Sequence, residues 1–129
     1  MVVPEELSYT AEHEWVRRED DGTVRIGITD YAQEQLGDIV FVSLPATGST
    51  VAAGGVLGEV ESTKSVSEIY APIAGEVVAR NEDLENRPEL INSEPYAGGW
   101  IVAIRPAAED DVSGLLDAAA YQQLLDTAS

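Results

Sequence analysis

The sequence predicts a mostly-β protein, a sandwich or a barrel, and three observations lead to this fold class. Short stretches in which apolar and polar residues alternate dominate the chain, and Gly, Pro, Asn or Ser separates them, as in sheets with one buried face. The chain has 129 residues, a length that fits one domain. Its apolar fraction of 44% is ordinary for a globular protein, which argues against wholesale disorder.

Seven alternating stretches are expected to form strands. They are Trp15–Arg18, Val24–Ile28, Asp38–Leu44, Val56–Ser62, Val66–Tyr70, Glu76–Arg80 and Trp100–Arg105. A short polar break separates the fourth from the fifth stretch, and this pattern predicts a β-hairpin. Large apolar side chains on the strands are the expected core, namely Trp15, Ile28, Val40, Phe41, Val42, Trp100, Ile101 and Ile104.

Two short helices are expected between the strands. Asp30 followed by Gln33 resembles a capping box with Asp30 as the N-cap, and Gly37 is well placed to end that helix. Pro88 suits the first turn of a second helix that runs through Asn92, because its missing N–H is not needed there. Both segments would lie between predicted strands.

A third helix is expected near the end of the chain. Asp117 is a good N-cap for a helix over about residues 118–126. Tyr121, Leu124 and Leu125 would give this helix an apolar face.

The charge and the cysteine count exclude several classes of function. Seven basic residues against 24 acidic ones give a net charge of −17, which repels nucleic acid and anionic membranes. This charge favours a monomer and encounters with basic surfaces of partner proteins. The absence of cysteine excludes disulfides and thiolate catalysis, and with His13 as the single histidine we expect no metal site.

The sequence predicts a cytoplasmic location. No stretch approaches the roughly 18 apolar residues that a membrane span needs. The first residues, Met-Val-Val-Pro-Glu-Glu, lack the basic and apolar regions of a signal peptide and the Arg/Ser character of a transit peptide.

The single lysine of the chain, Lys64, lies in the predicted hairpin turn. Thr63 and Ser65 flank it, and Glu61 and Glu68 bracket the turn. A primary amine at the tip of a hairpin is a good acceptor for acylation, because its stem is extended while its base is fixed. Uniqueness alone is weak support, since the composition disfavours lysine throughout.

Six short stretches follow one another along the chain as a recognisable set. They are His13–Val16, Ile26–Gln33, Leu36–Val42, Glu61–Ser65, Pro72–Val77 and Leu90–Tyr96. Together they resemble the glycine cleavage system H protein family, across about residues 8–106, and a terminal helix is expected as well. Six blocks in order are a far more specific signal than a lone lysine motif.

This resemblance implies a barrel-sandwich hybrid, of the lipoyl/biotinyl kind, in which lipoate is amide-linked to Lys64. It implies a non-catalytic carrier whose chemistry belongs to the cofactor. The expected partners are the pyridoxal-phosphate glycine decarboxylase, the tetrahydrofolate-dependent aminomethyltransferase, dihydrolipoamide dehydrogenase and a lipoylating enzyme. The whole chain, residues 1–129, would form a single lipoyl-carrier domain.

The resemblance also implies that the loaded arm folds back onto the carrier near His13. On that basis Glu14, Glu68 and His13 are carried over as arm-docking residues. The residues alone favour plainer roles, with the glutamates as solvated strand residues and His13 as a structural side chain beside Trp15. Glu12 departs from the smaller polar residue that is more usual, so the detailed lining of the docking cleft differs in this chain.

Three alternatives remain open at the level of sequence. Biotinyl domains present lysine from a similar hairpin, although methionines flank that lysine where this chain has Thr63 and Ser65. A lipoyl relay protein, which donates lipoyl groups to other carrier domains, needs the same hairpin. An acidic β domain that only binds partners would never be modified at Lys64.

Overall fold

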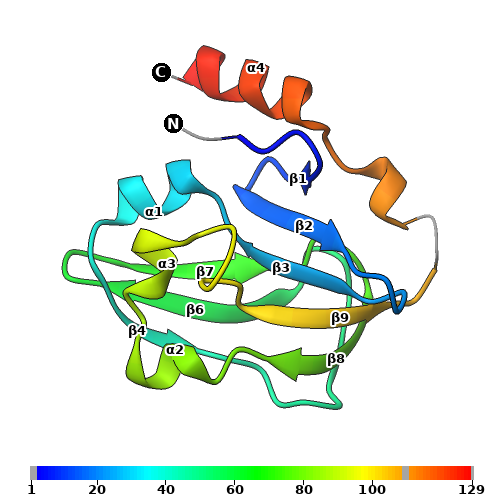
Figure 1. The fold of residues 1–129 in the computed structure, drawn as a ribbon, viewed down its shortest axis with the longest axis horizontal. Coiled ribbons are helices and arrows are strands. Elements are labelled where there is room, and N and C mark those ends of the chain that lie inside the picture. Colours follow the sequence, from blue (N-terminus) through cyan, green and yellow to red (C-terminus); the bar gives the residue numbers. More distant parts are fainter. Residues whose placement is uncertain (1–2, 109–110, 129) are drawn as a thin grey trace.

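The computed structural model describes residues 3–108 and 111–128, and two antiparallel sheets form the framework of that part of the chain (Figure 1). The larger sheet has the order β1-β2-β3-β9-β8-β5, and the smaller has the order β4-β6-β7. The strands of the larger sheet are β1 (Ser8–Tyr9), β2 (Glu14–Arg18), β3 (Val24–Ile28), β9 (Val102–Pro106), β8 (Gly75–Arg80) and β5 (Thr50–Val51). Those of the smaller sheet are β4 (Ile39–Ser43), β6 (Val56–Ser62) and β7 (Val66–Tyr70).

The main core lies between the two sheets. Ile26 and Ile104 from the larger sheet and Val60 from the smaller one are 0% exposed, and they belong to one apolar cluster. Alternation along the second half of β6 explains the arrangement, because Val60 and Ser62 are buried whereas Glu59 and Glu61 are exposed. The prediction of a mostly-β fold is therefore confirmed.

A second apolar cluster ties the two ends of the chain together. Tyr9 on β1 and Tyr121 on α4 (Ala118–Ala128) stack with ring centroids 4.6 Å apart, and Trp15 packs in the same cluster. Asp117 caps α4 as predicted, because its Oδ1 accepts a hydrogen bond from the N–H of Ala120 at 2.8 Å. Leu125, on the predicted apolar face, is buried here.

The first helix, α1 (Asp30–Leu36), begins one residue earlier than the capping box suggests. Thr29 is the N-cap, with an extended backbone, and its Oγ1 accepts from the N–H of Ala32 at 3.3 Å. Asp30 is already helical and accepts instead from the side-chain amide of Gln33, so its assignment as N-cap is wrong. The helix ends at Gly37, as predicted.

The segment between β8 and β9 holds two short helices rather than one. The structure adds α2 (Asp83–Asn86), which sequence patterns did not predict. The next helix, α3 (Leu90–Ser93), begins after Pro88, whose carbonyl accepts from the N–H of Ile91 in the preceding turn. None of the helices within the described residues combines the length and apolar character that a membrane crossing requires.

The core prediction is wrong for Val40 and Phe41. These side chains on β4 are 49% and 58% exposed. A β-bulge between Ile39 and Phe41 shifts the pairing with β6, so both consecutive residues face outward while Ile39 and Val42 stay buried. A strictly alternating pattern could not predict that both side chains are exposed, because the bulge inserts one extra residue into β4 and shifts the alternation.

Candidate functional site

Lys64 lies in the turn between β6 and β7, and its side chain is exposed. The N–H of Ser62 donates to the carbonyl of Ser65 at 2.8 Å, which closes the turn. The buried Oγ of Ser62 accepts from the backbone N–H groups of Lys64 and Ser65 at 3.3 and 3.1 Å. The backbone of the lysine is therefore fixed while the residue as a whole stays exposed.

A second element supports this turn from outside. The N–H of Thr63 donates to the carbonyl of Asp38, at 3.0 Å, in the connection between α1 and β4. The stem of Lys64 lies against the neighbouring Gly37, because a Cβ built on that glycine would be 3.3 Å from Lys64 Cε. Gly37 has φ +86°, a backbone conformation that favours glycine.

Asn92 on α3 holds the same connection in place. Its Oδ1 accepts from the N–H of Ile39 at 2.9 Å, and its Nδ2 donates to the Gly37 carbonyl at 2.9 Å and to Gln33 Oε1 at 3.0 Å. Sequence reasoning missed this role. Asn92 is far from Lys64 along the chain, and no local pattern relates the two residues.

A pocket of about 240 Å³ lies between α1, residues 12–14 at the start of β2, and strands β6 and β7. It brings together the three residues predicted for arm docking, His13, Glu14 and Glu68, and it adds Glu12. Apolar side chains line the rest of its wall, among them Ile28, Leu36, Val60 and Ile69. Lys64 is not among the lining residues, but β6 and β7 lead from the pocket to its turn.

Glu14 is the buried carboxylate of this pocket, with an exposed fraction of 2%. Its Oε1 accepts from Thr10 Oγ1 at 2.6 Å, and its Oε2 accepts from the N–H of Tyr70 at 3.2 Å. Burial raises the pKa of Glu14, the two hydrogen bonds oppose that rise, and the charge of Glu12 adds to it. A cation that entered the pocket would favour the charged form of Glu14.

His13 is held by the C-terminal helix. Its Nδ1 lies 2.8 Å from the hydroxyl of Tyr121 on α4, and that hydroxyl lies 2.7 Å from Oγ1 of Thr29. Its ring also contacts that of Tyr31, with centroids 4.7 Å apart. Burial lowers the pKa of His13, which opposes its protonation near neutral pH, and its φ of +70° is unusual for a residue with a side chain.

Glu68 is on the rim of the pocket rather than inside it. Its side chain is exposed on β7, and its backbone pairs with that of Glu59 on β6. Glu12 is also exposed, so two solvated carboxylates stand beside the buried carboxylate of Glu14. The negative potential at the pocket mouth favours a cationic ligand.

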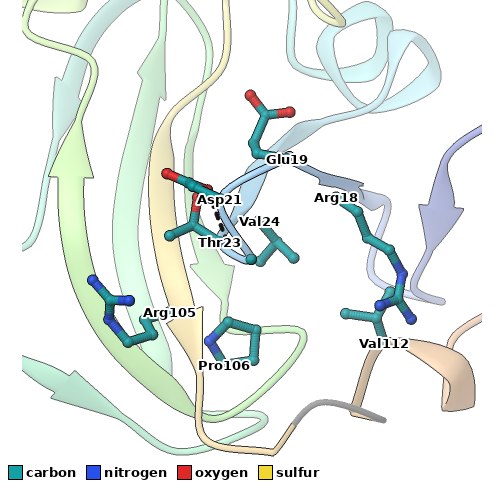
Figure 2. Close-up of a pocket in the computed structure, with 9 residues that line it drawn as sticks. Arg18, Glu19, Asp21, Thr23, Val24, Arg105, Pro106 and Val112 are labelled. Carbon is teal, nitrogen blue, oxygen red and sulfur yellow. Dashed lines mark hydrogen bonds between the residues drawn. The ribbon is translucent and has the colours of Figure 1, made fainter.

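Another hollow lies at the turn between β2 and β3, at the opposite end of the sheets from the Lys64 turn (Figure 1). Figure 2 shows Arg18, Glu19, Asp21 and Arg105 around it, a mixture of both charges. None of the predicted site residues lines it. Within the described residues, no group of three or more side chains suited to a metal ion occurs here or elsewhere.

Comparisons with known proteins agree on one family. The family model described as glycine cleavage H-protein matches residues 7–128. A glycine cleavage system H protein from Citrobacter koseri is 57% identical over 124 residues, covering 96% of both chains, and one from Escherichia coli K12 is 56% identical with the same coverage.

A solved structure of a glycine cleavage system H protein from Mycobacterium marinum superposes with a TM-score of 0.88 at 44% identity. It covers 96% of this chain and 99% of its own, which confirms the predicted lipoyl-type fold class. The resemblance in the six sequence blocks is confirmed as well, and the chain belongs to the glycine cleavage H-protein family.

Proposed function

We propose that this chain is the lipoyl carrier of glycine cleavage and that Lys64 bears the lipoyl group. The match to H proteins over nearly the whole chain carries the proposal. The carrier takes the aminomethyl group from the pyridoxal-phosphate glycine decarboxylase to the tetrahydrofolate-dependent aminomethyltransferase, and it passes electrons to dihydrolipoamide dehydrogenase. A lipoylating enzyme attaches the group, and the chain itself catalyses none of these steps.

The residues around Lys64 suit a lipoyl group. The lysine is exposed, and the hydrogen bonds to Ser62 and Asp38 fix the turn that bears it. Acylation removes the only ammonium from an acidic neighbourhood. When attached, the lipoyl group supplies a disulfide that accepts the aminomethyl group and a dithiol that is later reoxidised.

The pocket beside α1 suits the loaded end of the arm. Its apolar wall offers contact area for a hydrocarbon chain, while Glu14 and the rim carboxylate of Glu68 favour an ammonium. His13, held by Tyr121, forms part of the wall. In this proposal the pocket shields the aminomethyl group from water between enzymes.

Intact-mass measurement tests the attachment. The protein incubated with a lipoate ligase, lipoate and ATP should gain one lipoyl increment, and Lys64→Arg should gain none. An increment that persists in Lys64→Arg would place the modification on the α-amine. A biotin-sized increment on protein isolated from cells would end the lipoyl interpretation.

Glycine–CO₂ exchange separates the carrier from a lipoyl relay. The lipoylated protein mixed with glycine decarboxylase and labelled bicarbonate should give labelled glycine, because the decarboxylase must use the arm in both directions. A pure relay protein would transfer lipoyl groups to other domains and give no exchange. Absence of exchange with fully lipoylated protein would therefore contradict the carrier role.

Hydrolysis of the loaded arm tests the pocket. Glu14→Gln and Glu68→Gln should still gain one full lipoyl increment but should release the aminomethyl group faster, as formaldehyde and ammonia. Glu59→Gln is the matched control, because Glu59 is exposed on the strand beside Glu68 but does not line the pocket. Equal release rates in all three variants and the parent protein would rule out docking in this pocket.

A further inference from the structure

Apolar side chains gather on the outer face of the smaller sheet, beside the Lys64 turn. Val40, Phe41 and Val66 are 49%, 58% and 58% exposed. Phe41 on β4 pairs with Glu61 on β6, and Glu61 pairs with Val66 on β7. Phe41, Glu61 and Val66 therefore form one row across the sheet. We call Val40, Phe41, Glu61 and Val66 the turn-side face. Two strand spacings separate the ends of the row, about 10 Å.

The backbone is shaped to expose this face. A regular strand would bury either Val40 or Phe41, because successive side chains point to opposite sides. The bulge between Ile39 and Phe41 turns both of them outward. Single exposed apolar residues are ordinary, whereas a cluster placed in solvent by a bulge next to a modification site indicates a contact surface.

The charge around the turn-side face has one sign. Glu59, Glu61 and Glu68 are exposed on β6 and β7, and the sequences of β4, β6 and β7 contain no arginine or lysine. Lys64, in the turn itself, is the only cation between Ile39 and Tyr70 in the sequence, and acylation neutralises it. A partner complementary to the turn-side face would have an apolar surface patch bordered by basic side chains.

We propose that the turn-side face is the docking surface for the enzyme that acylates Lys64, an inference that rests on the proposed lipoyl function. Before acylation Lys64 is a short side chain whose stem lies against Gly37. The enzyme must bring its active site to Nζ itself, and so it must cover the strands on either side of the turn. Enzymes that act on the dithiolane bind it at the far end of the lipoyl chain, away from the turn. They therefore need less contact with the turn-side face.

The reaction itself supplies no further discrimination. Lipoate reacts with ATP to give the lipoyl adenylate, and pyrophosphate leaves. The lipoyl carbonyl then forms an amide bond with Nζ, AMP leaves, and Nζ releases a proton. Recognition must therefore come from the carrier surface, and Phe41 and Val66 are its most exposed large apolar side chains beside the turn.

Steady-state lipoylation tests the surface. With a lipoate ligase, lipoate and ATP, the double variant Phe41→Thr/Val66→Thr should show a KM for the carrier raised by about tenfold, with kcat unchanged. Val56→Thr is the matched control, because Val56 is 53% exposed on the same sheet but pairs with Tyr70 at the far end of the hairpin. Its KM should equal that of the parent protein.

Added salt should raise the KM of the parent protein, since the proposed contact includes exposed charges. Once fully lipoylated, the double variant should support glycine–CO₂ exchange as well as the parent does. An unchanged KM, or an equal rise in Val56→Thr, would overturn the assignment. A loss confined to the decarboxylase assay would overturn it as well and assign the face to that enzyme.

The two proposals fail in different ways. If the parent protein accepts no lipoyl group, the proposed function fails, and the docking inference fails with it. If the parent and the double variant are lipoylated with the same KM, only the docking inference fails. Far-UV circular dichroism of each variant verifies that these exposed substitutions leave the fold intact.

Discussion

The β2–β3 and β6–β7 hairpins both have exposed turns, but among the described residues only the β6–β7 turn is hydrogen-bonded to a segment outside its own hairpin. The β2–β3 turn is stabilised by its own residues, because Asp21 Oδ1 accepts from both the N–H and the hydroxyl of Thr23. The β6–β7 turn has similar internal bonds through Ser62, and in addition Thr63 is hydrogen-bonded to Asp38. Asn92 in turn holds the segment that contains Asp38.

This difference matches what each turn has to do. A turn that only reverses the chain needs local hydrogen bonds and a residue tolerant of positive φ. In the proposed function the β6–β7 turn presents Lys64 to several enzymes, so it must also keep the direction of that side chain. The contact of Lys64 with Gly37 and the bond to Asp38 supply this constraint from residues distant in sequence.

The largest expected effect follows from Gly37→Ala. Gly37 has φ +86° and ψ −158°, so alanine should lower the free energy of unfolding by about 2 kcal/mol. Its Cβ would also press on the Lys64 stem, so the kcat/KM for lipoylation should fall several-fold. Urea unfolding and a ligase assay measure the two effects.

Gly22→Ala is the matched control in the other turn. Gly22 has φ +88°, but a Cβ there would meet nothing within 4 Å. It should lose about 1 kcal/mol of stability and lipoylate like the parent. Equal lipoylation by the Gly22 and Gly37 variants would show that the Lys64–Gly37 contact does not matter.

Asn92→Ala should loosen the Lys64 turn from a distance. Loss of its three side-chain hydrogen bonds should cost about 1–2 kcal/mol of stability. Because the chain has no cysteine, a nitroxide on Lys64→Cys reports this turn alone, and its spectrum should show greater mobility. Asn81→Ala, which removes bonds to the carbonyls of Gly98 and Trp100, should destabilise the fold without changing that spectrum.

Glu14→Gln should alter the pH dependence of stability. Burial raises the pKa of Glu14, so the folded chain keeps a proton at pH values where the unfolded chain has released it. The contribution of Glu14 to stability therefore falls as pH rises from the ordinary carboxyl pKa through the raised one. Denaturation from acidic to neutral pH should show the parent losing stability relative to the variant, and parallel curves would contradict this sign.

Asp21→Asn should give the smallest effect, with the opposite sign. The hydrogen bonds from Thr23 lower the pKa of Asp21, so its contribution is present above the ordinary carboxyl pKa and is lost as pH falls through the lowered value. The variant should be slightly less stable than the parent at neutral pH. Denaturation curves should converge in strongly acidic solution, whereas a gap that widens there would be inconsistent with this assignment.

Local sequence patterns predicted the elements in which one physical signal dominates. The alternation over Val56–Ser62 and Val66–Tyr70 placed that hairpin with the observed bounds, and Asp117 marked the start of α4 correctly. The Asp30 cap was wrong because Thr29, which is also among the favoured capping residues, takes the N-cap one position earlier. The short strands β1 and β5 have only two residues each, too few for a period to appear.

Only the site residues that belong to recognisable local sequence motifs could be predicted. Lys64, His13, Glu14 and Glu68 could be named from the sequence, and the structure gathers the last three in one pocket. Their roles in docking remain proposals. The contributions of Asn92, Gly37 and Tyr121 depend on contacts between segments far apart in sequence, and the exposure of Phe41 depends on a bulge that no composition rule indicates.

The pairing of the two ends of the chain has a practical consequence. Tyr9 and Leu116 exchange backbone hydrogen bonds at 2.8 and 2.9 Å, and Val3 packs in the same apolar cluster as Leu124. A circularly permuted gene that joins these ends and opens at Asp21 should therefore still encode a foldable carrier with an unobstructed lysine. Reporter fusions that precede Val3 or follow α4, by contrast, adjoin the cluster that contains Tyr121, the partner of His13, so long linkers are advisable there.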